Sequence, residues 1–495
     1  MALFTLLPLL HVVGYSAGVG LDVVRAELFR PRMAWLLWHS VALVLGGVAL
    51  SAVIATACAW TVERTDIPAP RLWRALLVAP LAVPAFVNGY AWVSLTHAVE
   101  GYLGAVLIVS LSYFPFIYLP VTASLLHLDP EFEDTAHTLG LGGWATFTRV
   151  VLPQIRPALL GGSLLVALHL LAEFGALQML RYPTFTTAIY EQFGTTFNGP
   201  SANLTASVLV LLCLIVLVAE LRLRGRASIV RVGGGVARPP VRAALGAGRR
   251  PVIAGLILVA VLAIGVPVAS LIHWMVIGSS TAFPVADLVQ TTLTTLGFAA
   301  AGAAIATIAA IPVAVLVVRK PSMISTLIER STFTASALPG IVIALALVGL
   351  VLSLTPLIYQ TAAVLVGAYV MMFASRAVVG VRSALDHAPP VLEDVSGSLG
   401  LTSWGTFRRV TLPLVAPGVA AATALVFIAI ATELTATLLL APIGTRTLAT
   451  QFWSESSAMA YGAAAPYALL LVLLSIPATV MLGRMASPAP QATRR

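Results

Sequence analysis

The chain has 495 residues, of which 59% are hydrophobic and only 9% charged, and its mean hydropathy is +0.99. Soluble domains carry about 25% charged residues, so this composition excludes a soluble fold and indicates a polytopic membrane protein. We interpret the formal net charge of +9 as basic inner loops and not as a nucleic-acid surface. Cys58 and Cys213 lie in apolar runs and indicate neither a disulfide framework nor a metal centre.

Apolar runs of roughly 20 residues, long enough to cross a bilayer core of about 30 Å, recur between short polar loops, which favours helical spans over a barrel. The first run has no basic residues ahead of it, so we predict a short first span and not a cleaved signal peptide. The fold class is therefore all-α integral membrane, with twelve helices. The predicted spans are 3–19, 37–61, 73–95, 101–125, 158–180 and 204–221, then 252–277, 291–318, 328–353, 358–382, 416–440 and 462–483.

The basic residues predict the orientation of these spans. With the N-terminus inside, 22 of the 28 Lys and Arg residues lie in or beside inner loops, as the positive-inside rule expects. Both termini are then cytoplasmic. The inner loops are 62–72, 126–157, 222–251, 319–327, 383–415 and the C-terminal tail.

A duplication divides the chain into two repeats, 1–221 and 252–495. Between them, 222–251 is a basic linker rich in Gly and Pro, a composition typical of a boundary. An offset of 260 residues aligns 133–173 with 393–433, and the aligned loops both follow the fourth span of their repeat. The repeats therefore run parallel, and we predict a translocation path along the pseudo-two-fold axis between them.

Two inner loops carry nearly the same polar string. EDTAHTLGLGGWATFTRVVLP lies within 126–157, and EDVSGSLGLTSWGTFRRVTLP within 383–415; we call these the first and second polar loops. In the first, Asp129-Pro130 favours a helix start and Gly140 a helix end. A second short amphipathic helix with Trp144 on its apolar side should end at Pro153, and the second polar loop repeats this pattern.

Two interpretations of the polar loops remain. Amphipathic helices that carry tryptophan can lie in the lipid interface. Alternatively, each loop is a docking surface for one subunit of a cytoplasmic partner, which explains why it occurs twice, and we favour this interpretation.

The spacing Glu, Gly and Leu-Pro in both loops resembles the cytoplasmic loop signature of ABC importer permeases, although Asp134-Thr135 and Asp394-Val395 stand where that signature has two alanines. The resemblance implies a type I importer permease in which each polar loop is a coupling helix on one of two ATPase subunits. The residues implied in ATPase coupling are Glu133, Asp134, Gly140, Trp144, Arg149 and Pro153, with Glu393, Asp394, Gly400, Trp404, Arg409 and Pro413.

The ATPase itself is not encoded in this sequence. A P-loop needs G-x-x-x-x-G-K-[ST], and the one lysine, Lys320, lies in RKPS. We therefore expect no enzyme activity, no catalytic residues and no bound cofactor in this chain, with ATP and Mg²⁺ on the partner ATPase. The histidines show no metal-ligand spacing.

Three further stretches resemble the fused ferric-iron permease family: LLVAPLAVPAFVNGYAW (76–92), AEFGALQMLRYPTFTTAIY (172–190) and TELTATLLLAPIGTRTLATQFW (432–453). The resemblance covers nearly the whole chain and implies import of ferric iron, delivered by an extracytoplasmic binding protein, across a bacterial inner membrane. Thiamine and 2-aminoethylphosphonate permeases share this layout, so those cargoes stay open.

Two pairs of residues inside the spans are further candidates, one pair for the substrate pathway and one for a gate or kink. Glu173 and Glu433 align at the 260-residue offset, and an ionisable residue in a span is a functional hypothesis. They would contact a cation, or they would accept hydrogen bonds within the bundle or pair with Arg181 or Arg376. Pro84 and Pro339 are predicted kinks that shape a gate or only bend their helices.

Two other classes of protein fit part of the sequence. A secondary transporter also has twelve spans in two parallel halves, but it needs no docking loops. A membrane-embedded enzyme should show clustered His, Asp or Glu in its spans, and this sequence has isolated carboxylates.

Overall fold

The computed structural model describes residues 2–18, 20–129, 131–196, 198–224, 243–281 and 283–485, and in this part of the chain every regular element is a helix. Pro130, residues 225–242 of the predicted linker and the tail from 486 lie outside it. The chain divides into two compact units, each assembled from three stretches of sequence. Unit 1 holds 1–35, 185–214 and 279–474, and unit 2 holds 36–184, 215–278 and 475–495.

Unit 2 carries most helices of the first repeat together with the first predicted span of the second. Its elements are α3 (Pro31–Arg64), α4 (Pro70–Val78), η1 (Ala79–Ala82), α5 (Ala85–Val93), η2 (His97–Val99), α6 (Tyr102–Tyr113), α7 (Pro115–His127), α8 (Glu131–Thr138), α9 (Gly143–Thr146), η3 (Phe147–Val151), α10 (Leu152–Ala172), α11 (Gly175–Met179), η5 (Gly246–Gly248), α14 (Arg249–Ala260), η6 (Val261–Gly265) and α15 (Val266–Ile277).

Unit 1 carries most helices of the second repeat together with α1, α2, α12 and η4 of the first repeat. Its elements are α1 (Ala2–Gly18), α2 (Leu21–Leu28), α12 (Phe185–Tyr190), η4 (Glu191–Thr195), α16 (Val285–Arg319), α17 (Met323–Ser336), α18 (Gly340–Leu354), η7 (Pro356–Ile358), α19 (Ala362–Asp386), α20 (Pro390–Ser398), α21 (Ser403–Thr406), η8 (Phe407–Thr411), α22 (Leu412–Ala431), α23 (Thr435–Leu440) and α24 (Leu448–Ser457). Three helices continue from unit 1 into unit 2: α3, whose first residues Pro31–Trp35 belong to unit 1, α13 (Gly199–Arg224) and α25 (Tyr461–Met485).

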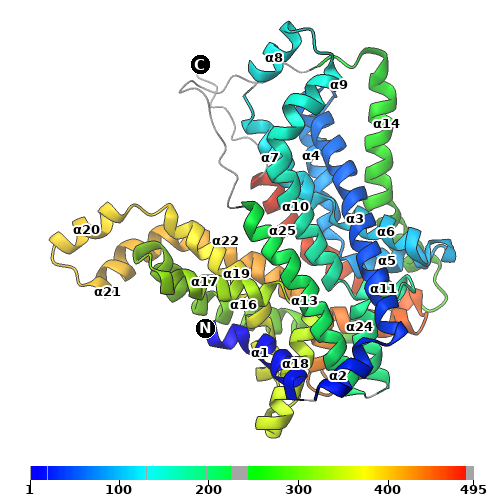
Figure 1. Cartoon of the computed structure of the whole chain (residues 1–495), viewed down its shortest axis with the longest axis vertical. Helices are drawn as coiled ribbons and strands as arrows, with labels where there is room; N and C mark the ends of the chain where they lie inside the picture. The colour runs from blue at the N-terminus through cyan, green and yellow to red at the C-terminus, as the bar shows by residue number, and fades with distance from the viewer. Residues whose placement is uncertain are drawn as a thin grey trace. The chain divides into compact units, whose positions relative to one another are not determined.

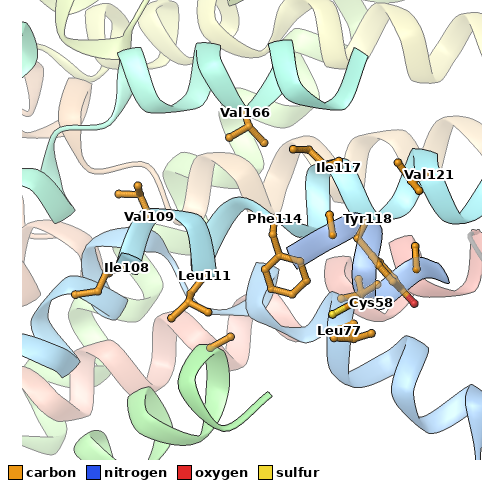
Figure 2. Packing of buried hydrophobic residues seen from close by; sticks show 14 of the residues in the cluster. Cys58, Leu77, Ile108, Val109, Leu111, Phe114, Ile117, Tyr118, Val121 and Val166 are labelled. Carbon is orange, nitrogen blue, oxygen red and sulfur yellow. The ribbon is translucent and has the colours of Figure 1, made fainter. Parts of the chain in front are cut away.

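The core of unit 2 lies where α3, α4, α6, α7 and α10 meet. Phe114 and Tyr118, both at most 1% exposed, pack among aliphatic side chains from the neighbouring helices (Figure 2). Gly162 of α10 lies so close to Ile117 of α7 that a Cβ there would come within 2.8 Å of the Ile117 backbone. Small residues allow membrane helices to approach in this way, and the close contact fixes α10, which carries both the first polar loop and Glu173.

The core of unit 1 is built by α16, α19 and α22, which pack on one another. Gly380 of α19 lies against Ala422 of α22, and Gly418 of α22 against Ala384 of α19. The N-terminal helix α1 packs on α17 and α18 of the same unit, where the ring of His11 lies over Gly349. Helix α1, from the first repeat, thus packs against helices of the second repeat and belongs to the core of unit 1.

The described residues contain eight helices long and apolar enough to cross a membrane, or up to eleven if each of three bent pairs is one span. This agrees with an all-α membrane protein. The predicted first span corresponds to α1, whose apolar part, Leu3–Tyr15, is shorter than a full span.

Three of the predicted spans, 73–95, 101–125 and 328–353, each consist of two helices joined at a bend. The bends are 88° between Pro70–Ala82 and Ala85–Val93, 45° between Tyr102–Tyr113 and Pro115–His127, and 102° between Met323–Ser336 and Gly340–Leu354. In each pair a proline at the break lacks the N–H needed to continue the helical ladder.

Candidate functional site

The first polar loop begins with the short helix α8, which ends at Gly140. Gly140 has φ +82°, its N–H bonds His137 O at 3.0 Å, and the N–H of Leu141 bonds Ala136 O at 3.0 Å. This is a Schellman motif, in which a left-handed glycine closes the helix. The predicted role of Gly140 as a helix end is confirmed. Figure 1 shows α8 and α9 at the end of unit 2 opposite α5 and α11.

The second polar loop has the same geometry. Gly400 has φ +86°, its N–H bonds Gly397 O at 3.0 Å, and the N–H of Leu401 bonds Ser396 O at 3.1 Å. Residues 131–140 and 391–400 also have exposed, half-buried and buried positions in the same order. Duplicated sequence therefore produces duplicated structure at both loops.

The predicted end of the second amphipathic helix at Pro153 and Pro413 is wrong. The helix runs without interruption from Gly143 to Ala172, and from Ser403 to Ala431 in the second copy. Ahead of each proline the helix widens into a π-helical turn, η3 or η8, in which Leu152 N–H bonds Phe147 O and Leu412 N–H bonds Phe407 O. A proline ring collides with the carbonyl four residues earlier in a regular α-helix, and the wider turn removes that collision.

Several polar-loop residues lie on the surface and contact little of their own unit. Trp144 and Trp404 are 78% and 70% exposed, and each stacks on the phenylalanine three residues later. Two leucines that the sequence analysis missed, Leu139 and Leu399, are equally prominent, at 77% and 79% exposed; their alignment at the 260-residue offset was an available signal. Also exposed are Asp134, Asp394, Arg149, Arg409, Pro153 and Pro413.

The glutamates of the polar loops behave differently, because each forms an ion pair with an arginine at the end of a long helix. Glu133 Oε1 lies 3.0 Å from Nη2 of Arg64, which is 2% exposed. Glu393 Oε1 lies 2.8 Å from Nη2 of Arg319. Burial raises the pKa of Glu133, an effect that the nearby Arg64 charge opposes. No local motif in the sequence pairs these arginines with the glutamates.

Glu173 and Glu433 both stand at a break in their helix. The carboxylate of Glu173 accepts the N–H of Ala176 at 2.9 Å and the hydroxyl of Tyr113. The carboxylate of Glu433 accepts the N–H groups of Ala436 and Thr437 at 3.0 and 3.1 Å. Each therefore caps the short helix that follows, α11 or α23, by supplying acceptors for its first N–H groups.

The suggested ion pairs of these carboxylates are not formed. Arg181 pairs with Glu100 at 3.4 Å, and Arg376 lies over the ring of Phe373 at 5.3 Å. In the first repeat, Glu173 has aromatic neighbours that the sequence did not single out. The ring of His169 lies 5.5 Å from that of Tyr113, and its Nδ1 is 2.8 Å from Leu165 O. Glu173 and Glu433 are both partly exposed, so hydrogen bonding within the bundle is compatible with a second role.

Pro84 and Pro339 occupy equivalent breaks. Each is the last residue before a helix, with φ −54° and ψ 142° at Pro84 and φ −57° and ψ 142° at Pro339. The spans bend at both prolines, as the predicted kinks require, and each proline is the junction between two helices, at the 88° or the 102° bend. Whether they shape a gate stays a prediction. Among the residues that the structure describes, no group of three or more His, Cys, Asp or Glu side chains is arranged to hold a metal ion.

Comparison with known proteins places both polar loops inside matched segments. Residues 68–226 and 302–487 match the family described as "Binding-protein-dependent transport system inner membrane component". The Fe(3+)-transport system permease protein FbpB 2 of Haemophilus influenzae is 38% identical over 472 residues, which covers 95% of this chain and 93% of that protein.

More distant matches cover one repeat. The sulfate transport system permease protein CysW of Escherichia coli is 28% identical over 246 residues, or 46% of this chain and 84% of that protein. Among solved structures, a chain of the inward-facing MetNI methionine ABC transporter matches with 19% identity and a TM-score of 0.33, over 41% of this chain and 96% of that chain.

Proposed function

This chain belongs to the family of inner-membrane components of binding-protein-dependent transport systems, and on that premise we propose that it is the permease subunit of an ATP-driven importer of ferric iron. The family match covers both repeats, and the two polar loops lie at equivalent places within it. The observation that carries the proposal is the identity of 38% with the Fe(3+)-transport permease of Haemophilus influenzae, over 95% of this chain.

Each polar loop is proposed to dock on one of two cytoplasmic ATPase subunits. Support comes from the duplicated Schellman turns and from the exposed apolar side chains beside them, Leu139 and Trp144 in the first loop and Leu399 and Trp404 in the second. Tryptophan is enriched among the residues that dominate protein interfaces, and exposed apolar patches mark interaction sites. ATP and Mg²⁺ would bind the ATPase subunits, and this chain would hold no cofactor of its own.

Because the helix that carries Trp144 continues through η3 into α10, movement of the docked loop would pass directly to Glu173 at the far end of α10. The same continuity joins Trp404 to Glu433 through α22. Closure of the two ATPases would in this way drive the spans between inward-open and outward-open states. The cytoplasmic placement of both loops and both termini rests on the distribution of basic residues.

The extracytoplasmic partner would be a binding protein that delivers ferric iron. We propose that Glu173 and Glu433 contact the cargo as it passes, since carboxylate oxygens suit a hard cation and both residues are partly exposed. Pro84 and Pro339 would hold the bent spans that shape the gate.

Reconstitution tests this function. The permease, its ATPase and the ferric-loaded binding protein are combined in proteoliposomes, and iron uptake is measured with and without ATP. We expect uptake only with ATP and only with the ATPase present. Uptake driven by an ion gradient without the ATPase would reject the proposal in favour of a secondary transporter. Uptake of thiamine or 2-aminoethylphosphonate in place of iron would retain the mechanism and correct the cargo.

A further inference from the structure

We propose that Arg64 and Arg319 are positioning residues that link the polar loops to the membrane spans, an inference that rests on the proposed function. Each arginine is at the C-terminal end of a long apolar helix, α3 or α16. The two align at an offset of 255 residues, which also relates Pro84 to Pro339. They are therefore equivalent residues of the two repeats.

Arg64 joins three helices of unit 2 through one side chain. Its Nη2 donates to the carbonyl of Leu125, near the end of α7, at 3.0 Å and lies 3.0 Å from the Glu133 carboxylate of α8. Its Nε and Nη1 are buried and have no hydrogen-bond partner among the described residues. A guanidinium that is 2% exposed depends on Glu133 for its charge balance, because an unpaired buried charge is costly.

Arg319 repeats this junction in unit 1. Its Nη2 donates to the carbonyl of Ala388, just after α19, at 3.0 Å and to Glu393 of α20 at 2.8 Å, while its Nε donates to the same carboxylate oxygen at 3.2 Å. The long helix, the end of the preceding span and the first helix of the polar loop are again joined by one guanidinium. The presence of the same three-way junction in both repeats indicates a shared task.

The first junction extends further into the membrane-spanning part. Glu63, the neighbour of Arg64 in the chain, accepts two hydrogen bonds from Arg74 of α4, at 2.7 and 2.6 Å. Helix α4 is in the half of the bent span that precedes Pro84. The charged series Glu133, Arg64, Glu63 and Arg74 therefore connects α8 to the bent span through the end of α3.

In the second repeat, the helix before the bend, α17, forms a different ion pair. Glu329 of α17 accepts a hydrogen bond from Arg382 of α19 at 2.6 Å, and neither residue contacts α20 or α21 through a hydrogen bond or ion pair among the described residues. Arg382 is thus a matched control: its ion pair joins two spans of the same unit without involving the polar loop.

The experiment compares Arg64→Gln, Arg319→Gln and Arg382→Gln in the complete complex with ATPase and binding protein. Co-purification of the ATPase, iron uptake per ATP hydrolysed and stimulation of ATP hydrolysis by the loaded binding protein are measured. We expect the first two variants to retain ATPase association and to lose about fivefold or more in uptake per ATP, the lower end of a typical coupling. Arg64→Gln should lose more than Arg319→Gln, since Arg64 is the more deeply buried, and Arg382→Gln should retain wild-type coupling.

A second variant separates coupling from folding. Arg64→Met combined with Glu133→Met replaces the ion pair by apolar side chains, which often preserves stability. We expect this variant to assemble and melt like the wild type while uptake per ATP stays low. Wild-type coupling in it, or in Arg64→Gln and Arg319→Gln, would overturn the inference, as would an equal loss in Arg382→Gln. A wild-type complex without ATP-dependent uptake or stimulation would instead reject the proposed function.

Discussion

Trp144 stacks on Phe147 of the same continuous helix, with ring centroids 5.7 Å apart and planes inclined by 30°. Trp404 and Phe407 repeat the contact at 5.6 Å and 26°. Each stack places the indole against its own helix, while 78% of Trp144 and 70% of Trp404 remain exposed. A rigid exposed indole can form an interface with little loss of side-chain entropy.

We therefore expect Trp144→Ala with Trp404→Ala to change the free energy of unfolding by about 1 kcal/mol or less at each site, the scale of one aromatic pair. Binding of the ATPase should weaken by roughly 2 kcal/mol or more at each loop, as for an interface anchor. Thermal melting and ATPase titration measure the two effects. Trp38→Ala, which removes an equally exposed indole (70%) from α3, is the control and should leave ATPase binding unchanged.

Gly140 and Gly142 provide a matched pair for the turn geometry. Neither has any atom within 4 Å of an added Cβ, but Gly140 has φ +82° and Gly142 has φ −69°. Gly140→Ala should destabilise the first polar loop by about 1–2 kcal/mol, the cost of a left-handed residue with a Cβ, and should reduce ATPase association. Gly142→Ala should be close to neutral. Amide hydrogen exchange across residues 131–141 checks this, and equal protection in both variants would contradict the role of Gly140.

Much of this loop geometry could be predicted from sequence because the glycines, tryptophans and glutamates recur at one offset of 260 residues. Arg64 and Arg319 could not be found in that way, since their offset is 255 and no local motif surrounds them. Their ion pairs form only when the end of a long helix meets a loop more than 60 residues away in sequence.

The size of the bends at Pro84 and Pro339 could not be predicted from the sequence, for another reason. An apolar run has the same composition whether its helix is straight or bent by 88° or 102°, and hydropathy reports only that the run is buried in lipid or protein. At Pro153 and Pro413 the error was the reverse: a proline suggests a helix end, but a π-helical turn lets the helix continue.

Burial raises the pKa of Glu133 above its ordinary value, which gives a pH dependence. A carboxyl whose folded pKa exceeds its unfolded pKa binds protons more tightly when folded, so its contribution to stability is complete below the unfolded pKa and is lost as pH rises through the folded pKa. Wild type should therefore gain stability relative to Glu133→Gln as pH falls from 7 toward about 4. Melting temperatures of both proteins across this range test the sign, and a loss of wild-type stability relative to Glu133→Gln on acidification would contradict it.

Glu173→Gln combined with Glu433→Gln should reduce iron uptake at least about tenfold, or ~1.4 kcal/mol, while ATPase association and assembly stay intact. The amide oxygen of glutamine still accepts the N–H groups that follow each break, but the negative charge offered to a cation is gone. Tyr113→Phe is the control, because it removes the hydroxyl that donates to Glu173 and leaves the charge. Unchanged uptake in the double variant would reduce the two carboxylates to helix caps.

Pro84→Ala and Pro339→Ala test the bent spans. Alanine accepts the φ values of −54° and −57°, so the fold should survive with a loss of about 0.4–1 kcal/mol from the greater freedom of the unfolded chain. The restored N–H allows the helix to extend across the bend, and we expect a lower uptake rate at unchanged ATPase binding. Wild-type uptake in both variants would show that the prolines only terminate helices.

The composition of unit 1 has a consequence for biosynthesis. Helix α1 packs on α17 and α18, but α17 begins only at Met323, about 300 residues after α1 ends at Gly18. At roughly 5–20 residues per second, α1 leaves the ribosome some 15–60 s before its packing partners exist. Over that interval lipid or an insertion chaperone must shield the apolar surface of α1. Helix α1 therefore enters the membrane before the second-repeat helices on which it packs have been synthesised.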